Sequence, residues 1–266
     1  MSPIVHLVRH AEGLHNLGQE HWSLIDPLLT DRGREQCLQL RKTFPFHSNI
    51  ELVVSSPLSR AIFSAVESFL PVFQSRAEQK LLLLPDLQEI GDFPCDIGSS
   101  VEDLTERLKD LNVLIDYSHV DRAWTSKTGR YSPLISAIRA RARAVRYWLS
   151  TRPEKEIIVV SHGAFLHFLT EDWEDSYLEE ATGWKNAEYR TYELKTTARQ
   201  SATSDGTPRC INDACMTETP ESRLRRGKTS TAPSLEEQVR LCVQALHIWE
   251  QQGYLRSGGD EVTWAD

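Results

Sequence analysis

The chain has 266 residues, of which 40% are hydrophobic and 26% are charged, and this composition is typical of a globular protein with a substantial core. Its formal net charge of −8 argues against a broad nucleic-acid-binding surface, which needs clustered Lys and Arg. The sequence also holds no apolar run near the roughly 20 residues that span a bilayer, so we expect neither a nucleic-acid nor a membrane partner. Because Met1-Ser2-Pro3 leads straight into an apolar segment without a signal-peptide pattern, we expect a cytoplasmic location, with the nucleus as an addition.

The cysteines are odd in number and scattered along the chain. They are Cys37, Cys95, Cys210, Cys215 and Cys242. Cys210 and Cys215 are too few for a zinc site without further ligands. We therefore predict reduced thiols, no disulfide and no metal site.

The first predicted element is a short strand that ends in an Arg-His pair. Ile4 to Val8 is mostly apolar and β-branched, which is typical of a strand buried on both faces, and Arg9 and His10 follow directly. Ligands of open α/β sheets bind beyond the carboxyl ends of the strands, so this pair is a candidate catalytic site. In the next stretch, 14–29, Asn16 is the best candidate for lining the same pocket, and His15, His21 and Trp22 are further polar or aromatic candidates; for His21 an exposed surface position is equally acceptable.

The next two predicted strands are likewise followed by charged side chains. A helix capped by Thr30 or Asp31 runs to about 44, and the apolar strand 52–54 then leads into a helix that carries Arg60 about one turn in. A third strand over 81–84 is followed by Glu89. Each charged side chain comes just after a strand, so all of them can open on one edge of one sheet.

Between 90 and 131 the pattern loosens into turns and one short helix. An insertion of this kind is where an α/β enzyme places a cap that selects substrates. The candidate lining residues of this cap are Asp92, Asp96, Trp124, Lys127, Arg130 and Tyr131. Its aromatic side chains suit a substrate with an apolar body, and simple packing explains them equally well.

The following helix, 136–148, is rich in arginine. Arg139, Arg141, Arg143 and Arg146 alternate with apolar residues, and we interpret them as a solvated face. The buried strand 157–160 then delivers His162, whereas His167 is interpreted as an ordinary helix residue. A last strand is predicted over 184–194, and a place at a sheet edge would suit it.

After residue 194 the composition changes. Residues 195–233 are poor in large apolar side chains and rich in Ser, Thr, Pro and charge, which predicts a flexible linker or long loop, with the basic run 223–228 solvated. Residues 234–254 resume helical spacing and predict a C-terminal helix packed on the domain or on a partner such as a second copy.

Taken together, these stretches resemble the histidine phosphatase superfamily, the phosphoglycerate-mutase-like group. The matching residues are Arg9-His10, Leu29-Thr30-Asp31-Arg32-Gly33 with Gln36, Ser56-Pro57-Leu58 with Arg60-Ala61, Glu89, and Ser161-His162-Gly163. Fungal members are the most similar, through LHN at 14–16, PCD at 94–96 and FLTEDW at 168–173. Ala11 departs from the family's usual Gly but is also small.

The resemblance covers 1–194 and implies an α/β fold: a three-layer α/β/α sandwich with a mostly parallel central sheet, a cap insertion and, in this chain, a C-terminal helix. It also implies the roles of the site residues. His10 is the nucleophile that forms a phosphohistidine, and Glu89 is the general acid and base. The residues expected to bind the phosphoryl group are Arg9, Arg60, His162, Asn16 and the N–H groups near Gly163.

This scheme needs no metal and no cofactor, and it predicts a phosphatase acting on a small-molecule phosphate ester. Two other catalytic functions remain open: a phosphomutase, and a repurposed pocket that performs acid/base chemistry such as dehydration of a secondary metabolite. A non-catalytic binding module that uses the C-terminal linker and helix is the third alternative. The identity of the substrate depends on the cap and is not predicted.

Overall fold

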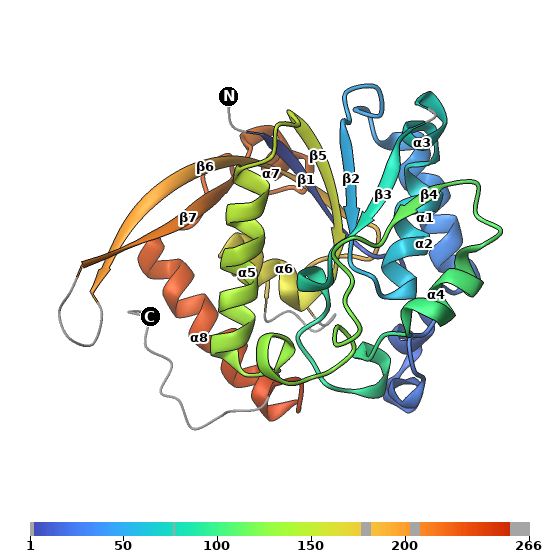
Figure 1. Ribbon diagram of the computed structural model, residues 1–266. Coiled ribbons are helices and arrows are strands. Elements are labelled where there is room, and N and C mark those ends of the chain that lie inside the picture. Colours follow the sequence, from blue (N-terminus) through green and yellow to red (C-terminus); the bar gives the residue numbers. More distant parts are fainter. Residues whose placement is uncertain (1–2, 77, 177–181, 203–207, 256–266) are drawn as a thin grey trace.

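The computed structural model (Figure 1) describes residues 3–76, 78–176, 182–202 and 208–255, with the backbone alone for 196–202 and 208–213. Its centre is a seven-stranded sheet with the strand order β4-β3-β2-β5-β1-β6-β7. The strands are β1 Ile4–Arg9, β2 Leu52–Ser55, β3 Lys80–Leu83, β4 Leu114–Asp116, β5 Glu156–Ser161, β6 Tyr189–Ala202 and β7 Pro208–Glu218. Strands β1 to β5 are mutually parallel, and β6 and β7 are antiparallel additions.

Helices cover both faces of this sheet, which confirms the three-layer α/β/α fold (Figure 1). One face carries α5 Ile135–Ser150, α6 Gly163–Thr170 and α8 Leu235–Gln251; the other carries α1 Asp31–Thr43, α2 Ser59–Ser68, α3 Leu70–Ser75 and α4 Val101–Leu108. Successive side chains of a strand point to opposite faces of the sheet. Leu7 therefore packs in the core under α5, α6 and α8, and Val8 packs in the core under α1 to α4. The central strands are buried on both sides for this reason, and their sequences are mostly apolar, with His6 as a buried polar residue within β1.

Parallel pairing brings the loops that carry the predicted site residues to one edge. Arg9 lies opposite Ser161 in the β1–β5 register, and Ser55 lies opposite Val160 in the β2–β5 register. The segments that follow β1, β2, β3 and β5 therefore leave the sheet side by side. Short 3-10 helices shape the loop after β1 (η1 Leu14–Leu17 and η2 Gln19–Ser23), the loop after β3 (η3 Pro85–Leu87 and η4 Pro94–Asp96) and the segment after β4 (η5 Gly129–Tyr131).

Helix α1 supports the loop after β1 directly. The Thr30 hydroxyl oxygen accepts from the Gly33 N–H and caps the helix, and the Gln36 side chain accepts from the Glu12 N–H at 2.8 Å. A Cβ on Gly33 would lie 2.1 Å from the Glu12 carbonyl oxygen, so only glycine allows this close approach. Helix α1 thus fixes the backbone just after His10.

Residues 90–131 follow β3 as an insertion, and most of this stretch is built into the domain. Strand β4 pairs with β3 at the sheet edge, and α4 buries Leu104 and Leu108 in the core. Trp124 is 1% exposed, and a Cβ on Gly98 would meet its ring at 1.8 Å. The helical spacing of apolar residues in α4 and the pairing of β4 with β3 therefore determine the structure of this stretch more than its turn-rich composition does.

The prediction that the arginines of α5 form a solvated face is wrong for two residues. Arg141 is 1% exposed and donates to the carbonyl oxygens of Asp86 and Gln88, and Arg146 is 4% exposed and donates to that of Phe168. Backbone carbonyls supply the partners that a buried guanidinium needs. The core face of α5 consequently includes both cations.

The predicted linker over 195–233 is also corrected. Residues up to 202 continue β6, β7 follows as its antiparallel partner, and α7 Pro220–Arg225 comes next. Ala214, Met216 and Glu218 are buried in alternation, which suits a strand of modest hydrophobicity. The basic run is not simply solvated, because Arg223 is 1% exposed and its guanidinium lies 3.0 Å from a Glu174 carboxylate oxygen.

The C-terminal helix predicted over 234–254 corresponds to α8, which begins after the Ser234 cap. It buries Leu241, Ala245 and Trp249 against the same core as α5 and α6. Beyond it, Gly253 adopts φ +77°, and the Tyr254 N–H donates to the Trp249 carbonyl oxygen at 2.8 Å. The chain thereby turns back toward the domain.

Among the described residues, no helix combines the length and apolar character needed to cross a membrane. Cys37, Cys95, Cys215 and Cys242 are free thiols, and the Cys210 side chain lies outside the described residues.

Candidate active site

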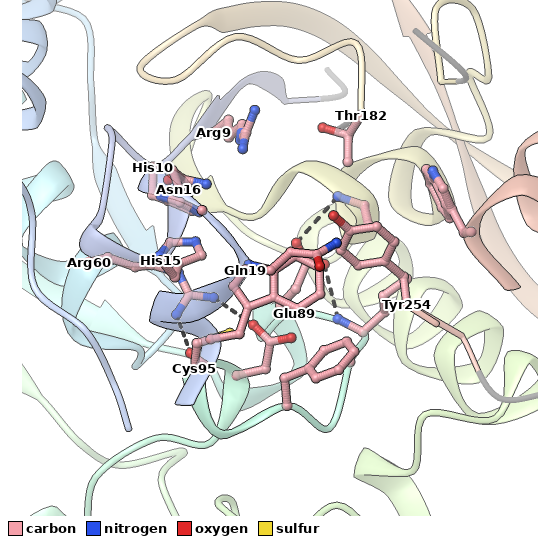
Figure 2. Close-up of a pocket in the computed structure, with 18 residues that line it drawn as sticks. Arg9, His10, His15, Asn16, Gln19, Arg60, Glu89, Cys95, Thr182 and Tyr254 are labelled. Atoms are coloured by element: carbon pink, nitrogen blue, oxygen red, sulfur yellow. Dashed lines mark hydrogen bonds and ion pairs between the residues drawn. The ribbon is translucent and has the colours of Figure 1, made fainter. Parts of the chain in front are cut away.

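A cavity of about 290 Å³ lies at the edge of the sheet where β1 ends (Figure 2). It is lined by Arg9, His10, His15, Asn16, Gly18, Gln19, Trp22, Arg60, Glu89, Ile90, Gly91, Phe93, Cys95, Asp96, Ala164, Thr182, Trp249 and Tyr254. The structure thus brings five of the seven predicted site residues onto one surface. His162 lies directly behind His10, with 5.0 Å between the ring centroids, and Gly163 follows it.

The His10 imidazole is held in one tautomer. Its Nδ1 lies 2.8 Å from the Ala11 carbonyl oxygen, which can only accept, so Nδ1 carries the ring proton and Nε2 keeps its lone pair. Burial and the positive charges of Arg60 and Arg9 lower the pKa of His10 well below its usual value. The imidazole is therefore unprotonated at neutral pH.

Two buried arginines flank His10. The Arg9 guanidinium donates to the Trp184 carbonyl oxygen, and that of Arg60 donates to the Cys95 carbonyl at 2.6 Å and to the Asp96 carboxylate at 2.9 Å. The Nε atoms of both arginines are buried and have no partner in the part of the chain that the structure describes. The guanidinium groups of Arg9 and Arg60, with these unpaired Nε–H donors, flank the Nε2 lone pair of His10. Their positive charges suit the binding of a tetrahedral anion.

His162 is oriented by Ser56. Its Nε2 lies 2.8 Å from the Ser56 Oγ, which itself accepts from the Leu58 N–H. If the Ser56 hydroxyl donates to Nε2, the ring proton lies on Nδ1; the same contact is also satisfied by an Nε2–H that donates to the hydroxyl oxygen. Within the described residues that buried Nδ1 has no hydrogen-bond partner, and burial followed by the charge of Arg60 lowers the pKa of His162 well below normal.

The Glu89 side chain contacts the N-terminal end of α6. Its carboxylate accepts from the Ile90 and Phe165 N–H groups, each at 3.0 Å, and at 3.4 Å from that of Ala164. Burial and, secondly, the negative charge of Asp96 raise the pKa of Glu89. A carboxyl group in this environment can hold and return a proton near the nucleophile.

Asn16 and Gly163 serve the site in different ways. Asn16 lines the cavity, and its Oδ1 accepts from the Gly13 N–H at 3.0 Å, which orients the amide. Gly163 does not line the cavity. A Cβ at this position would lie 2.2 Å from the Thr182 Oγ1, so the glycine is required for Thr182 to reach the cavity wall.

Most of the proposed cap residues lie elsewhere. Only Asp96 lines the cavity, where it pairs with Arg60. Lys127 donates to the Gln88 side chain at 2.7 Å, and burial lowers its pKa to about 8. Arg130 pairs with Asp86, Trp124 and Tyr131 pack in or against the core, and Asp92 is not part of the lining.

Several lining residues carry no clear signal in the sequence. Gln19, Phe93, Thr182, Trp249 and Tyr254 lie in turns or at the end of a helix, where periodicity says nothing about direction. His15 and Trp22 are the exceptions, because their short distance from His10 along the chain suggests the pocket. The His15 and His10 ring centroids are 5.3 Å apart.

Within the described ranges, no group of three or more His, Cys, Asp or Glu side chains is placed to hold a metal ion.

Known proteins provide a separate line of comparison. A phosphoglycerate mutase-like protein 1 of Arabidopsis thaliana is 31% identical over 196 residues, which cover 61% of this chain and 68% of that protein. A probable phosphatase of Schizosaccharomyces pombe is 32% identical over 170 residues, covering 60% and 73%, and supports in part the resemblance to fungal members. A solved phosphoserine phosphatase of Entamoeba histolytica, in complex with 3-phosphoglyceric acid, covers 79% of this chain and 96% of its own, with 21% identity and a TM-score of 0.41.

The family model described as "Histidine phosphatase superfamily (branch 1)" matches residues 5–204, the range that carries His10, Arg60, Glu89 and His162. The match extends over three quarters of the sequence and confirms the resemblance drawn from the motifs. The chain therefore belongs to the histidine phosphatase superfamily, branch 1.

Proposed function

We propose that this protein is a metal-independent phosphatase that hydrolyses a small-molecule phosphate monoester through a phosphohistidine on His10. The observation that carries the proposal is the tautomer of His10: Nδ1 is bonded to a carbonyl, and the Nε2 lone pair lies among buried arginines. Membership of the superfamily and the probable phosphatase among the relatives also support it.

In the first step His10 Nε2 attacks phosphorus in line with the ester oxygen. Arg9, Arg60, Asn16 and the Nδ1–H of His162 stabilise the charge on the equatorial oxygens. Glu89 gives its proton to the leaving oxygen, which its raised pKa favours.

In the second step water attacks the phosphohistidine. Glu89, now ionised, takes a proton from that water, and His10 leaves as the neutral imidazole that its low pKa favours. The products are an alcohol and inorganic phosphate. A phosphomutase would instead pass the phosphoryl group to a second hydroxyl of a bound substrate.

The test is to trap the intermediate. Wild-type protein is mixed with a phosphate ester in the presence of a chelator, quenched in alkali, and its intact mass is measured beside released phosphate. We expect a phosphorylated species that is absent from His10→Ala, together with a loss of turnover of about a thousandfold or more. His247→Ala, which removes an exposed histidine of α8, is the matched control.

Turnover by His10→Ala at the wild-type rate would refute the phosphohistidine route. Loss of activity with chelator, restored by a divalent cation, would refute metal independence. Phosphoryl transfer to a second hydroxyl without release of phosphate would assign a mutase instead.

A further inference from the structure

Three aromatic rings from distant parts of the chain meet at the outer end of the cavity. Trp22 belongs to η2, Phe93 precedes η4, and Tyr254 follows α8. The Trp22 ring centroid is 4.9 Å from that of Phe93 and 5.1 Å from that of Tyr254. We call these three residues the aromatic lid, and Figure 2 shows Tyr254 on the Glu89 side of the pocket.

The aromatic lid is not an extension of the hydrophobic cores. Trp22 and Phe93 belong to none of the core clusters, and Tyr254 only borders one of them. All three are half-buried and line the same cavity as His10. Aromatic surface held at the wall of a polar pocket offers a binding partner a flat apolar contact.

The position of Tyr254 is fixed from both sides. The Gly253 turn and the hydrogen bond from the Tyr254 N–H to the Trp249 carbonyl hold its backbone, and Leu255 is buried in the core. Burial is the main cause that raises the pKa of the Tyr254 hydroxyl, and the nearby acidic groups Asp96 and Glu89 raise it further. The lid is thus a preorganised wall that reaches down to the general acid.

The charges of the lining restrict what this wall can receive. The Arg and Lys side chains in the described lining are Arg9 and Arg60, which serve the phosphate end, and Arg60 is already paired with Asp96. Toward the lid the ionisable groups are the acidic side chains of Glu89 and Asp96. A leaving group with a second carboxylate or phosphate would meet these acidic side chains rather than a cation.

We propose that the aromatic lid is a leaving-group subsite, and that the protein prefers phosphate monoesters of uncharged, ring-containing alcohols. The inference rests on the proposed phosphatase activity. The lid rings pack against one another, with centroids 4.9, 5.1 and 6.3 Å apart, so they form a continuous wall and leave no space between them for an ammonium group. The balanced reaction is ester plus water to ring-bearing alcohol plus phosphate, with the proton moved through Glu89.

The test compares esters whose alcohols are similar as leaving groups. Phenethyl phosphate and ethyl phosphate differ by a phenyl ring, and 3-phosphoglycerate and phosphocholine add an anionic and a cationic body. We expect kcat/KM for phenethyl phosphate to exceed that for each of the others by about tenfold or more. This comparison uses the wild-type protein alone and is independent of how any variant folds.

Variants then locate the preference. Trp22→Ala and Phe93→Ala should reduce the phenethyl-to-ethyl ratio toward one, mainly through a higher KM for the phenethyl ester. Tyr147→Ala removes an aromatic ring that is 38% exposed on α5, away from the cavity, and should keep the wild-type ratio.

The outcomes separate the two proposals. Hydrolysis of no ester in the panel would overturn the proposed function itself. Hydrolysis with a wild-type ratio near one, or with 3-phosphoglycerate or phosphocholine preferred, would leave a phosphatase and overturn the ring subsite. An unchanged ratio in folded Trp22→Ala and Phe93→Ala would also overturn it.

Discussion

At the scale of single residues, the chemistry depends on opposite pKa shifts of two neighbouring groups. Burial with Arg60 and Arg9 lowers the pKa of His10, and burial with Asp96 raises that of Glu89. In the proposed mechanism the neutral form of each residue is the reactive one. The enzyme should therefore be active where the pH lies above the pKa of His10 and below that of Glu89.

The first prediction concerns the pH profile of kcat/KM with alkyl phosphates. As pH falls, activity should persist until it reaches the lowered pKa of His10, below the usual histidine range, because only then is the nucleophile protonated. As pH rises through the raised pKa of Glu89, the leaving group loses its acid and activity should fall. An optimum set by a histidine of ordinary pKa would contradict this assignment.

The second prediction concerns Asp96. Asp96→Asn removes the negative charge that raises the pKa of Glu89 and releases Arg60 from its ion pair, and both changes favour ionised Glu89. The alkaline limb for alkyl phosphates should move to lower pH. The exposed Asp110→Asn is the control, and its limb should match that of the wild type.

The third prediction concerns the contact between Gly163 and Thr182. Gly163→Ala places a Cβ 2.2 Å from the Thr182 Oγ1, so we expect a loss of about 1–3 kcal/mol in the free energy of unfolding despite the better helix propensity of alanine. Thr182→Gly should largely cancel this loss in the double variant. Urea unfolding of the four proteins of this cycle measures the coupling, and additive effects would show that the clash is relieved elsewhere.

The residues that sequence predicts well are those that follow strands. Arg9, His10, Glu89 and His162 come directly or shortly after buried apolar runs, and parallel strands must deliver them to one edge. Phe93 and Tyr254 have no such marker. Their directions depend on a turn before η4 and on Gly253, which local patterns do not reveal.

At the scale of elements, α5 supports the backbone that leads to the site, and the interpretation of its amphipathic pattern leaves this role out. Ile138, Arg141, Ala142 and Val145 share one face by their spacing of three and four residues, and that face is buried. The spacing alone therefore places Arg141 in the interior. The error lies in assuming that a charged residue must be solvated, although the carbonyls after β3 can bind it.

The fourth prediction follows from this placement. Arg141 donates to the carbonyls of Asp86 and Gln88 and positions the backbone that leads to Glu89. Arg141→Met should cost about 1–3 kcal/mol in the free energy of unfolding, because buried carbonyls lose their donors. It should also lower kcat for alkyl phosphates about 10- to 100-fold while KM changes little.

The control for this positioning role is Arg152→Met, which removes a guanidinium paired with Glu154 away from the cavity. Aryl phosphates need less help from a general acid and should be less affected by Arg141→Met. An equal loss on aryl and alkyl esters would indicate general damage to the fold instead.

At the scale of the whole molecule, α8 joins the core to the pocket. Trp249 is 2% exposed in the core shared with α5 and α6, and it also lines the cavity together with Tyr254. The spacing of apolar residues predicts this helix, but it does not predict that Trp249 lines the cavity. The orientation of the helix on the domain depends on contacts with residues distant in the sequence.

The fifth prediction tests that connection. Trp249→Ala should cost about 3–5 kcal/mol in the free energy of unfolding and also reduce kcat/KM, since it opens both the core and the cavity wall. Val243→Ala on the same helix, at a residue 50% exposed, should change stability by no more than about 0.5 kcal/mol. Urea unfolding and steady-state kinetics measure the two effects, and wild-type stability of Trp249→Ala would contradict the packing.

The order of the strands has a consequence for synthesis. Strand β1 leaves the ribosome well before its two neighbours in the sheet, β5 and β6, which begin at Glu156 and Tyr189. At translation rates of about 5–20 residues per second, the nascent strand waits on the order of ten seconds with both edges unpaired. Chaperones that shield exposed strands during translation should therefore raise the yield of active protein.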